Sequence, residues 1–116
     1  MQYLLMIYSA ETAEPEPGTP EFEAHIGRYL RLTDEMNEAG VMLDGRPLEP
    51  VSTATTVRLR QGATMVTDGP FAETKEQLGG FYLLDCPNLD DAIDWAKRIP
   101  SAEFGSIEIR PIMPLE

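Results

Sequence analysis

The chain has 116 residues, 42% of them hydrophobic, and 20 acidic against nine basic side chains give it a formal net charge of −11. This length suits a single domain with one core, and the ordinary apolar content excludes a disordered or fibrous chain. The acidic field repels phosphate groups, which argues against direct binding to nucleic acids and to anionic membranes.

The cysteine usage and the apolar runs indicate a cytoplasmic protein. A single cysteine, Cys86, excludes an internal disulfide and a cysteine-rich zinc site. It lies in the apolar run FYLLDC, where we expect a buried structural thiol. The opening MQYLLMIYSAE has no basic lead and too short an apolar run for a signal peptide. No stretch approaches the roughly 20 apolar residues of a membrane span.

The first third of the chain predicts a strand, an exposed loop and a helix. Residues 2–8, QYLLMIY, are apolar on both faces, as in a central strand that is covered on both sides. The acidic, proline-rich residues 9–18 predict a loop. Thr19 and Pro20 predict the start of a helix, and Gly40 its end. The side chains expected to face inward from this helix are Phe22, Ile26, Tyr29, Leu30, Thr33 and Met36.

The middle of the chain predicts a loop, a hairpin and one turn of helix. Residues 41–51, VMLDGRPLEPV, contain one glycine and two prolines that disfavour regular structure. Residues 53–60 alternate in polarity, and Gln61 and Gly62 predict a tight turn into ATMVTD. Asp68 then opens a turn with the next glycine and proline. AETKEQL favours a short helix that Gly79 ends and Asp68 caps.

The last third predicts a strand, a helix and a strand. Residues 80–86, GFYLLDC, are again apolar on both faces, so this strand is expected beside the first one. Asn88 predicts the start of the second helix and Pro100 its end. SIEIRPIM, residues 106–113, alternates as a strand does, with Ile107 and Ile109 inward. The inner face of the second helix is expected to contain Leu89, Ala92, Ile93, Ala96 and Ile99.

The predicted element order is β-α-β-β-insert-β-α-β. Two helices cover only one face of such a sheet, whereas two of its strands are apolar on both faces. A second copy of the chain would cover the remaining face. The sequence therefore predicts a symmetric homodimer that packs sheet against sheet.

His25 is the only histidine, and it lies at the edge of the apolar arc of the first helix. One interpretation is a packed side chain with a single hydrogen bond. The other is a general acid or base at the rim of a pocket between helix and sheet, because imidazole titrates near neutral pH.

Charged residues of the insert are the next candidates. Asp68 can be explained structurally as a helix cap. Glu73 and Lys75 are charged residues that a segment linking two strands does not require. Such groups beside a strand end can bind a polar ligand or exchange protons. Arg58 and Arg110 lie on polar strand faces, where they form ion pairs across strands or face a charged ligand cavity inside the dimer.

The sequence contains no motif for a metal or a cofactor. One histidine and no cysteine cluster leave only carboxylates as ligands, without the spacing of an EF-hand or of HExxH. P-loop and GxGxxG motifs are absent as well. We therefore expect no metal, no nucleotide and no other cofactor.

Residues 66–85, VTDGPFAETKEQLGGFYLLD, resemble the signature of the DGPF group within the YCII-related proteins. The likeness extends to the first strand YLLMIY, the helix closed by AGV, ATTVR and the final GSIEIRPI. It implies one domain over residues 1–116 with a ferredoxin-like α+β fold of the dimeric α-β barrel type, an antiparallel sheet with helices on one face. It also implies a bacterial protein, encoded beside or fused to extracytoplasmic-function sigma factors. No reaction is assigned to the group.

The resemblance also bears on chemistry. In the wider family, a histidine of the first helix and an aspartate before a proline after the second helix face one pocket, which suggests an enzyme. His25 matches that histidine, whereas the aspartate–proline pair reads Ile99-Pro100 here. The acid is therefore absent from its place, and Asp68 or Glu73 is the candidate to replace it.

Two functions follow as hypotheses. The first is a homodimer that binds a small molecule and carries out acid–base chemistry of unknown type. In it, His25 and Asp68 are catalytic, and the ligand contacts Glu73, Lys75, Arg58 and Arg110. The alternative is a non-catalytic sensing or regulatory module that works with a sigma factor.

Overall fold

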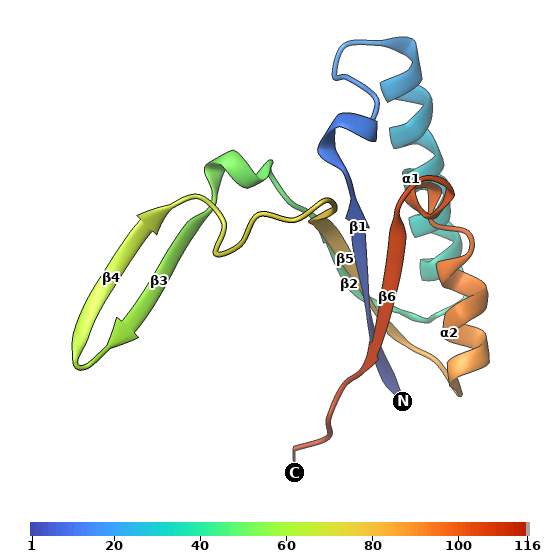
Figure 1. The fold of residues 1–116 in the computed structure, drawn as a ribbon. Helices are drawn as coiled ribbons and strands as arrows, with labels where there is room; N and C mark the ends of the chain where they lie inside the picture. The colour runs from blue at the N-terminus through green and yellow to red at the C-terminus, as the bar shows by residue number, and fades with distance from the viewer. Residues whose placement is uncertain (116) are drawn as a thin grey trace.

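The computed structural model describes residues 1–115 and contains a four-stranded antiparallel sheet with two helices on one face (Figure 1). The strands β1 (Gln2–Ser9), β2 (Met42–Pro47), β5 (Gln77–Asp85) and β6 (Ser106–Pro111) lie in the order β2-β5-β1-β6. The helices are α1 (Pro20–Glu38) and α2 (Leu89–Ala96). This is the ferredoxin-like α+β arrangement that the sequence predicted.

A hairpin of β3 (Thr55–Arg60) and β4 (Ala63–Asp68) forms a separate two-stranded sheet. It projects away from the four-stranded sheet, on the side opposite the helices (Figure 1). Gln61 and Gly62 both have positive φ, 53° and 79°, as a two-residue hairpin turn requires. The predicted hairpin is confirmed, and we call residues 55–68 the hairpin arm.

Three short 3-10 helices connect these elements: η1 (Glu11–Ala13), η2 (Val51–Thr53) and η3 (Pro100–Glu103). Both α-helices begin where the sequence predicted. Thr19 Oγ1 accepts a hydrogen bond from the Phe22 amide at 3.1 Å, and Asn88 Oδ1 accepts one from the Asp91 amide at 2.9 Å. No helix among residues 1–115 combines the length and the apolar character needed to cross a bilayer.

The core lies between the helices and the sheet. Tyr3, Leu5 and Ile7 of β1 point into it, since alternate residues of a strand face the same side. Cys86 is 1% exposed, and this burial raises the pKa of its thiol. The prediction of a buried structural cysteine is confirmed.

The predicted loop at residues 41–51 was wrong, because Met42–Pro47 form β2. This strand lies at the edge of the sheet and pairs only with β5, so its glycine and proline are tolerated. At Gly45 a Cβ atom would lie 2.8 Å from a ring carbon of Tyr82, which leaves room for glycine alone. β2, rather than the hairpin, supplies the second strand of the fold.

The short helix predicted for AETKEQL was also wrong. Residues 71–76 are irregular, and β5 already begins at Gln77. Ile7 pairs with Gly80 but Tyr8 pairs with Leu78, so Gly79 is the extra residue of a β-bulge. Pairing with β1 outweighs the local preference for helix, and Asp68 has no helix to cap.

The expected inner faces of the helices need correction. Ile26 and Leu30 of α1 are 39% and 62% exposed, and Leu89 and Ile93 of α2 are exposed as well. A cavity separates the N-terminal half of α1 from the sheet, so these α1 side chains face space rather than core. The buried residues of α1 are His25, Leu32 and Met36.

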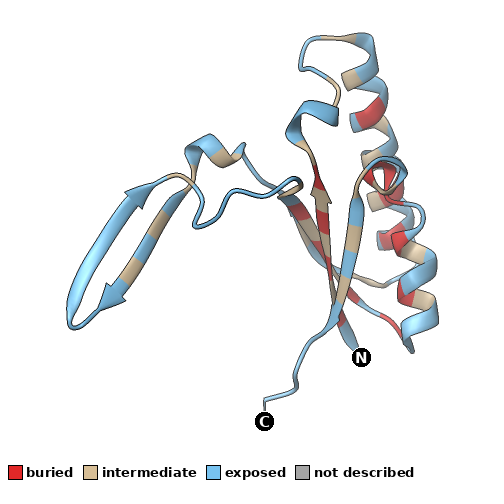
Figure 2. Ribbon diagram, in the orientation of Figure 1, coloured by how far each residue is buried: buried red, intermediate tan, exposed pale blue. Residues whose placement is uncertain are grey.

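The sheet has an apolar face that no other described element covers. Leu4, Met6 and Tyr8 of β1 alternate with the core residues, and Leu83 of β5 pairs with Leu4. All four side chains are half-buried, and Figure 2 shows buried and half-buried residues alternating along the central strands. We call these four residues the open face.

Gly105 allows β6 to leave η3 close against β1. A Cβ atom there would lie 2.1 Å from the Tyr8 carbonyl oxygen and 3.0 Å from that of Ser101. We expect Gly105→Ala to lower the free energy of unfolding by about 3 kcal/mol, because the backbone must shift. Urea unfolding followed by circular dichroism measures this loss.

The control is Gly27→Ala, in α1, where the nearest atom to the new Cβ is the end of the flexible Arg31 side chain at 3.6 Å. This variant should be unchanged or more stable by up to about 1 kcal/mol, since alanine favours helix. Equal stability of the two variants would contradict the close approach at Gly105.

Candidate active site

A cavity of about 570 Å³ lies between the N-terminal half of α1, the loop of residues 9–18 and the β2–β5 edge of the sheet. This volume is within the range of small-molecule sites, roughly 300–1,000 Å³. The walls are mainly apolar and include Ile7, Phe22, Ile26, Leu30, Met42 and Tyr82.

Three elements and the loop bring polar groups together in one wall of this cavity. His25 comes from α1, Glu14 from the loop, Ser9 from the end of β1 and Ser101 from η3. His25 Nε2 lies 3.0 Å from Glu14 Oε1. The His25 side chain is 9% exposed and that of Glu14 32%. We call these four residues, with Tyr29, the His25–Glu14 cluster.

Hydroxyl groups hold the other oxygen of the Glu14 carboxylate. Glu14 Oε2 accepts a hydrogen bond from Ser9 Oγ at 2.5 Å and another from Ser101 Oγ at 3.2 Å. The Tyr29 hydroxyl donates in turn to Ser101 Oγ at 2.7 Å. The carboxylate is therefore fixed on both sides, because Oε2 is hydrogen-bonded while Oε1 lies beside the imidazole.

The imidazole of His25 is positioned by packing. Its ring meets Tyr29 edge-on, with centroids 5.2 Å apart, and Phe104 at 5.9 Å. Nε2 is buried and makes no hydrogen bond, because Glu14 Oε1 is at ion-pair distance without the direction of an N–H···O bond. Native structures seldom leave a buried polar atom without a hydrogen bond. The ring is thus held by its aromatic neighbours, with the fixed Glu14 carboxylate beside Nε2.

The loop that carries Glu14 is anchored by its own sequence. Glu11 Oε2 accepts a hydrogen bond from the Val51 amide at 2.9 Å, and the Glu11 amide donates to Gln77 Oε1 at 3.1 Å. Pro15 and Pro17 limit the backbone on the other side of Glu14. The acidic loop is thus tied to the segments before β3 and at the start of β5.

The predicted partners of His25 lie elsewhere. Asp68 is the exposed last residue of β4, and Glu73 and Lys75 are exposed in the irregular segment before β5. None of the three lines the cavity. Among the described residues, the carboxylate at ion-pair distance from His25 belongs to Glu14.

The two predicted arginines are also outside the cavity. Arg58 lies on the hairpin arm and donates a hydrogen bond to the Phe71 carbonyl at 3.3 Å. Arg110 lies on β6, 3.8 Å from Glu108. The structure does not bring Arg58 and Arg110 together within one chain, and their contact with a ligand stays a prediction.

Sequence reasoning missed Glu14, Ser9 and Ser101. A signal was present, because an acidic loop that leads into the helix of His25 must lie near that helix's N-terminal half. Which glutamate of the loop turns inward depends on the 3-10 turn of η1, which the sequence did not predict. Ile99, at the place of the family's aspartate, is 1% exposed in the core.

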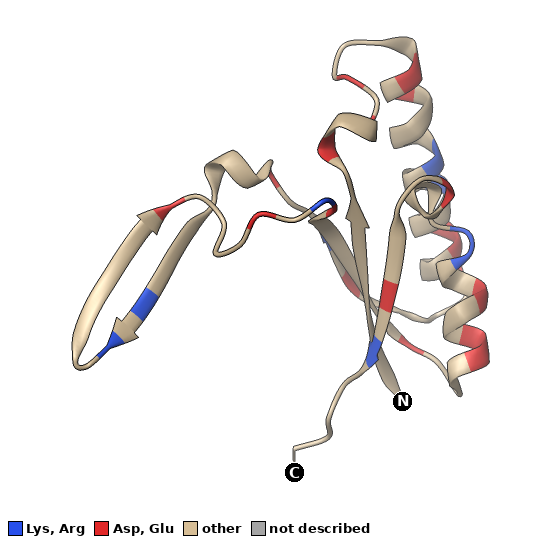
Figure 3. Cartoon of the chain, in the orientation of Figure 1, with Lys and Arg blue, Asp and Glu red and all other residues tan. Residues whose placement is uncertain are grey.

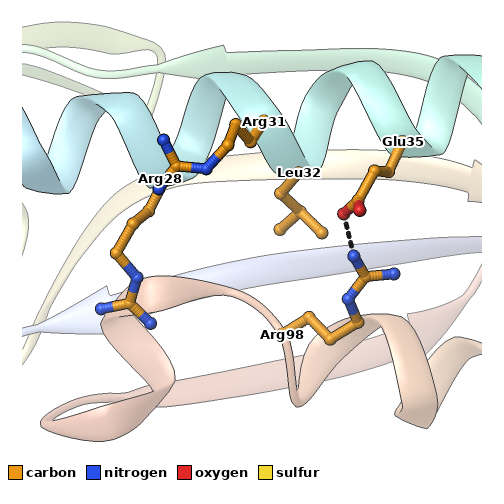
Figure 4. A pocket seen from close by; sticks show the side chains of 5 residues that line it. All are labelled: Arg28, Arg31, Leu32, Glu35 and Arg98. Atoms are coloured by element: carbon orange, nitrogen blue, oxygen red, sulfur yellow. Dashed lines mark hydrogen bonds and ion pairs between the residues drawn. The ribbon is translucent and has the colours of Figure 1, made fainter.

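A second, shallow hollow of about 190 Å³ is lined by Arg28, Arg31, Leu32, Glu35 and Arg98 (Figure 4). Figure 4 shows Glu35 of α1 and Arg98 after α2 in an ion pair. Arg28 binds Glu103 through two hydrogen bonds of 3.0 and 2.7 Å. These pairs brace α1 against the segment after α2, which accounts for Arg28 and Arg98 without a ligand.

No three His, Cys, Asp or Glu side chains among residues 1–115 gather as they would around a metal ion. The polar side chains that line the larger cavity are one imidazole, carboxylates, hydroxyls, the Gln77 amide and a single guanidinium from Arg46.

Comparison with known proteins identifies the family of this chain. The YCII-related domain family matches residues 1–116, and the chain belongs to that family. An uncharacterized protein of Rhizobium meliloti (strain 1021) is 40% identical over 114 residues, which cover 97% of this chain and 92% of that protein.

Among solved structures, 5-chloro-2-hydroxyhydroquinone dehydrochlorinase (TftG) from Burkholderia phenoliruptrix AC1100 is similar to this chain, with a TM-score of 0.49. That structure is a complex with 2,5-dihydroxybenzoquinone. The two proteins share 14% identity, and the match covers 97% of this chain and 94% of the other.

Tyr29 predicts a pH dependence. Burial raises the pKa of its hydroxyl to about 12, above the ordinary value of 10.0. Tyr29 therefore contributes stability that is fully present below about pH 10 and is lost as the pH rises toward about 12. Thermal melts between pH 9 and about 12 should show a steeper fall in melting temperature for the wild type than for Tyr29→Phe. Parallel curves would contradict the burial of the phenol.

Proposed function

We propose that the protein binds a small, uncharged and largely apolar molecule in the cavity and exchanges a proton with it through His25. The observation that carries this proposal is the buried imidazole in the wall of a cavity of about 570 Å³, with Nε2 3.0 Å from a fixed carboxylate. Apolar molecules that can lose a proton from a carbon atom or a hydroxyl group would suit both the apolar walls and His25 as the base.

The charge of the cavity supports an uncharged ligand. Three carboxylates line it, those of Glu11, Glu14 and Glu49, against the single guanidinium of Arg46. An anion would meet this excess of negative charge between mainly apolar walls, which costs free energy. The apolar walls favour a hydrophobic or aromatic skeleton.

The proton transfer is consistent with the geometry of the cluster. Glu14 lies beside Nε2 of His25. We therefore assign the proton exchange with the ligand to the other ring nitrogen, Nδ1. When the imidazole takes a proton, the resulting cation lies beside the Glu14 carboxylate rather than alone in an apolar wall. In this proposal Glu14 takes the role that the family resemblance gives to an aspartate, although it comes from a different segment of the chain.

A nitrobenzisoxazole tests the base directly. This neutral aromatic compound loses a carbon-bound proton to a base as its N–O bond breaks, and the coloured cyanophenolate is released. We expect the wild type to accelerate this elimination, because an imidazole held in an apolar site is a stronger kinetic base than one in water. His25→Gln should lower kcat/KM by at least about 100-fold and Glu14→Gln by about tenfold.

Glu16→Gln is the matched control, since Glu16 is an exposed glutamate of the same loop, and it should keep the wild-type rate. Absorbance of the phenolate measures all four proteins. A His25→Gln variant with the wild-type rate would show that His25 is not the base. Retention of the rate in His25→Gln with its loss in Glu14→Gln would transfer the role to Glu14.

We further propose that the chain forms a homodimer through the open face. Leu4, Met6, Tyr8 and Leu83 form an apolar patch on the two central strands, with no helix above it. A second copy would supply the missing layer of a two-sheet core, and a two-fold axis would let the same patch serve both partners.

Met6→Lys tests this interface. We expect light scattering to give the wild type a mass of about twice 12.9 kDa at micromolar concentration. The variant should have the mass of one chain, because two buried ammonium groups would meet near the axis. Leu83→Lys is the second variant, and circular dichroism checks that both are folded. A monomeric wild type would contradict the proposal.

The association with an extracytoplasmic-function sigma factor stays a prediction from the family resemblance. Co-purification with a sigma factor encoded beside this protein would support it. A pull-down without that sigma factor, from a host that encodes it there, would count against it.

A further inference from the structure

The hairpin arm has a face that its own chain does not use. Val57 and Leu59 of β3 share one face with Val66 of β4, which pairs directly with Val57. Their exposed fractions are 63%, 65% and 65%. In Figure 2 nearly the whole of the arm is coloured as exposed. These three residues are the apolar face of the arm.

The arm is joined to the rest of the chain only at its base. β3 and β4 pair with each other and with no strand of the four-stranded sheet. The hydrogen bonds at the base are local, from the Gly69 amide to the Ala54 carbonyl at 2.7 Å and from Thr56 Oγ1 to the Gly69 carbonyl at 2.8 Å. A two-stranded hairpin is at best marginally stable in water when nothing packs on it. The arm therefore requires a partner surface.

The net charge of the arm differs in sign from that of the rest of the chain, and this difference indicates the kind of partner. Residues 55–68 contain two arginines, Arg58 and Arg60, and one acidic residue, Asp68, so their net charge is +1. Since the whole chain has a net charge of −11, the remaining residues together carry −12. Figure 3 shows both arginines near the tip of the arm and acidic residues over the helices and loops of the main body. A cationic arm on an acidic body is complementary to another copy of the same chain.

We propose that the apolar face of the arm packs against a second copy of this chain. The arm projects on the side of the open face, where the second copy stands in the homodimer proposed above, and the inference rests on that dimer (Figure 1). Each partner then covers the Val57, Leu59 and Val66 patch of the other. A two-fold axis makes both arms equivalent.

Val57→Lys combined with Val66→Glu is the test. The two residues are a cross-strand pair, so opposite charges keep the hairpin paired while they remove its apolar face. We expect sedimentation velocity to show the dissociation constant of the dimer raised at least about tenfold. Met65→Gln, on the opposite face and paired with Arg58, keeps the charge of the arm; it is the control and should change the dissociation constant less than about threefold.

Hydrogen–deuterium exchange gives the second readout. Amides of residues 55–68 should be protected at concentrations where the dimer forms and should exchange fast in the monomeric Met6→Lys variant. An arm that is equally protected in that monomer packs on its own chain, which would overturn the proposal. Exchange that is fast in the dimer would overturn it as well.

The failures of the two dimer proposals are distinguishable. If Met6→Lys is monomeric while Val57→Lys/Val66→Glu keeps wild-type affinity, the open face holds the dimer and the arm proposal is wrong. If Met6→Lys stays dimeric and the arm variant dissociates, the arm proposal stands and the open-face interface is wrong. A wild type that is monomeric at all concentrations refutes both.

Discussion

The Glu14 carboxylate is the point on which the arrangement of the candidate site depends. One of its oxygens lies beside the imidazole of His25 on α1, and the other accepts hydrogen bonds from Ser9 at the end of β1 and Ser101 in η3. A single charged group from a surface loop thus joins the first strand, the first helix and the segment after the second helix. Hydrogen bonds to a charged group contribute more than those between neutral groups, roughly 1.5–3 kcal/mol each.

Through this convergence Glu14 supplies a carboxylate beside His25, although Ile99 stands where the family resemblance implies an aspartate. Ile99 belongs to the core, where a carboxylate would lack partners. The loop of residues 9–18 brings Glu14 to the imidazole instead. Hydrogen bonds of Glu11 with Val51 and Gln77 hold this loop in place. The carboxylate beside His25 therefore comes from a different segment of the chain than the resemblance implies.

Much of the fold could be predicted from the sequence, because its signals are local. The caps at Thr19 and Asn88, the two-faced strands and the Gln61–Gly62 turn all depend on residues next to each other. β2 and the residues before β5 were mispredicted, since their conformation depends on pairing with β5 and β1, which outweighs local propensity. Of the site, His25 was identified by its chemistry, whereas Glu14, Ser9 and Ser101 meet it only through the tertiary fold.

The same molecule leaves two apolar surfaces without cover in one chain, the open face and the apolar face of the arm. Exposed apolar patches of this kind often mark interaction sites, and the two proposed contacts between copies would cover both surfaces. The cavity lies on the helix side of the sheet, away from the open face, so the proposed ligand site and the proposed dimer interface are on different surfaces.

His25 is the only histidine, so its ring gives one isolated set of imidazole signals in a proton–carbon NMR spectrum. A titration with benzyl alcohol, benzoate and benzylamine compares a neutral, an anionic and a cationic form of one small aromatic skeleton. The account predicts saturable shifts of the His25 signals with benzyl alcohol and at least about tenfold weaker binding of benzoate. Unchanged His25 signals with benzyl alcohol, or equal affinity for benzoate, would contradict the central claim that this imidazole faces a cavity for uncharged ligands.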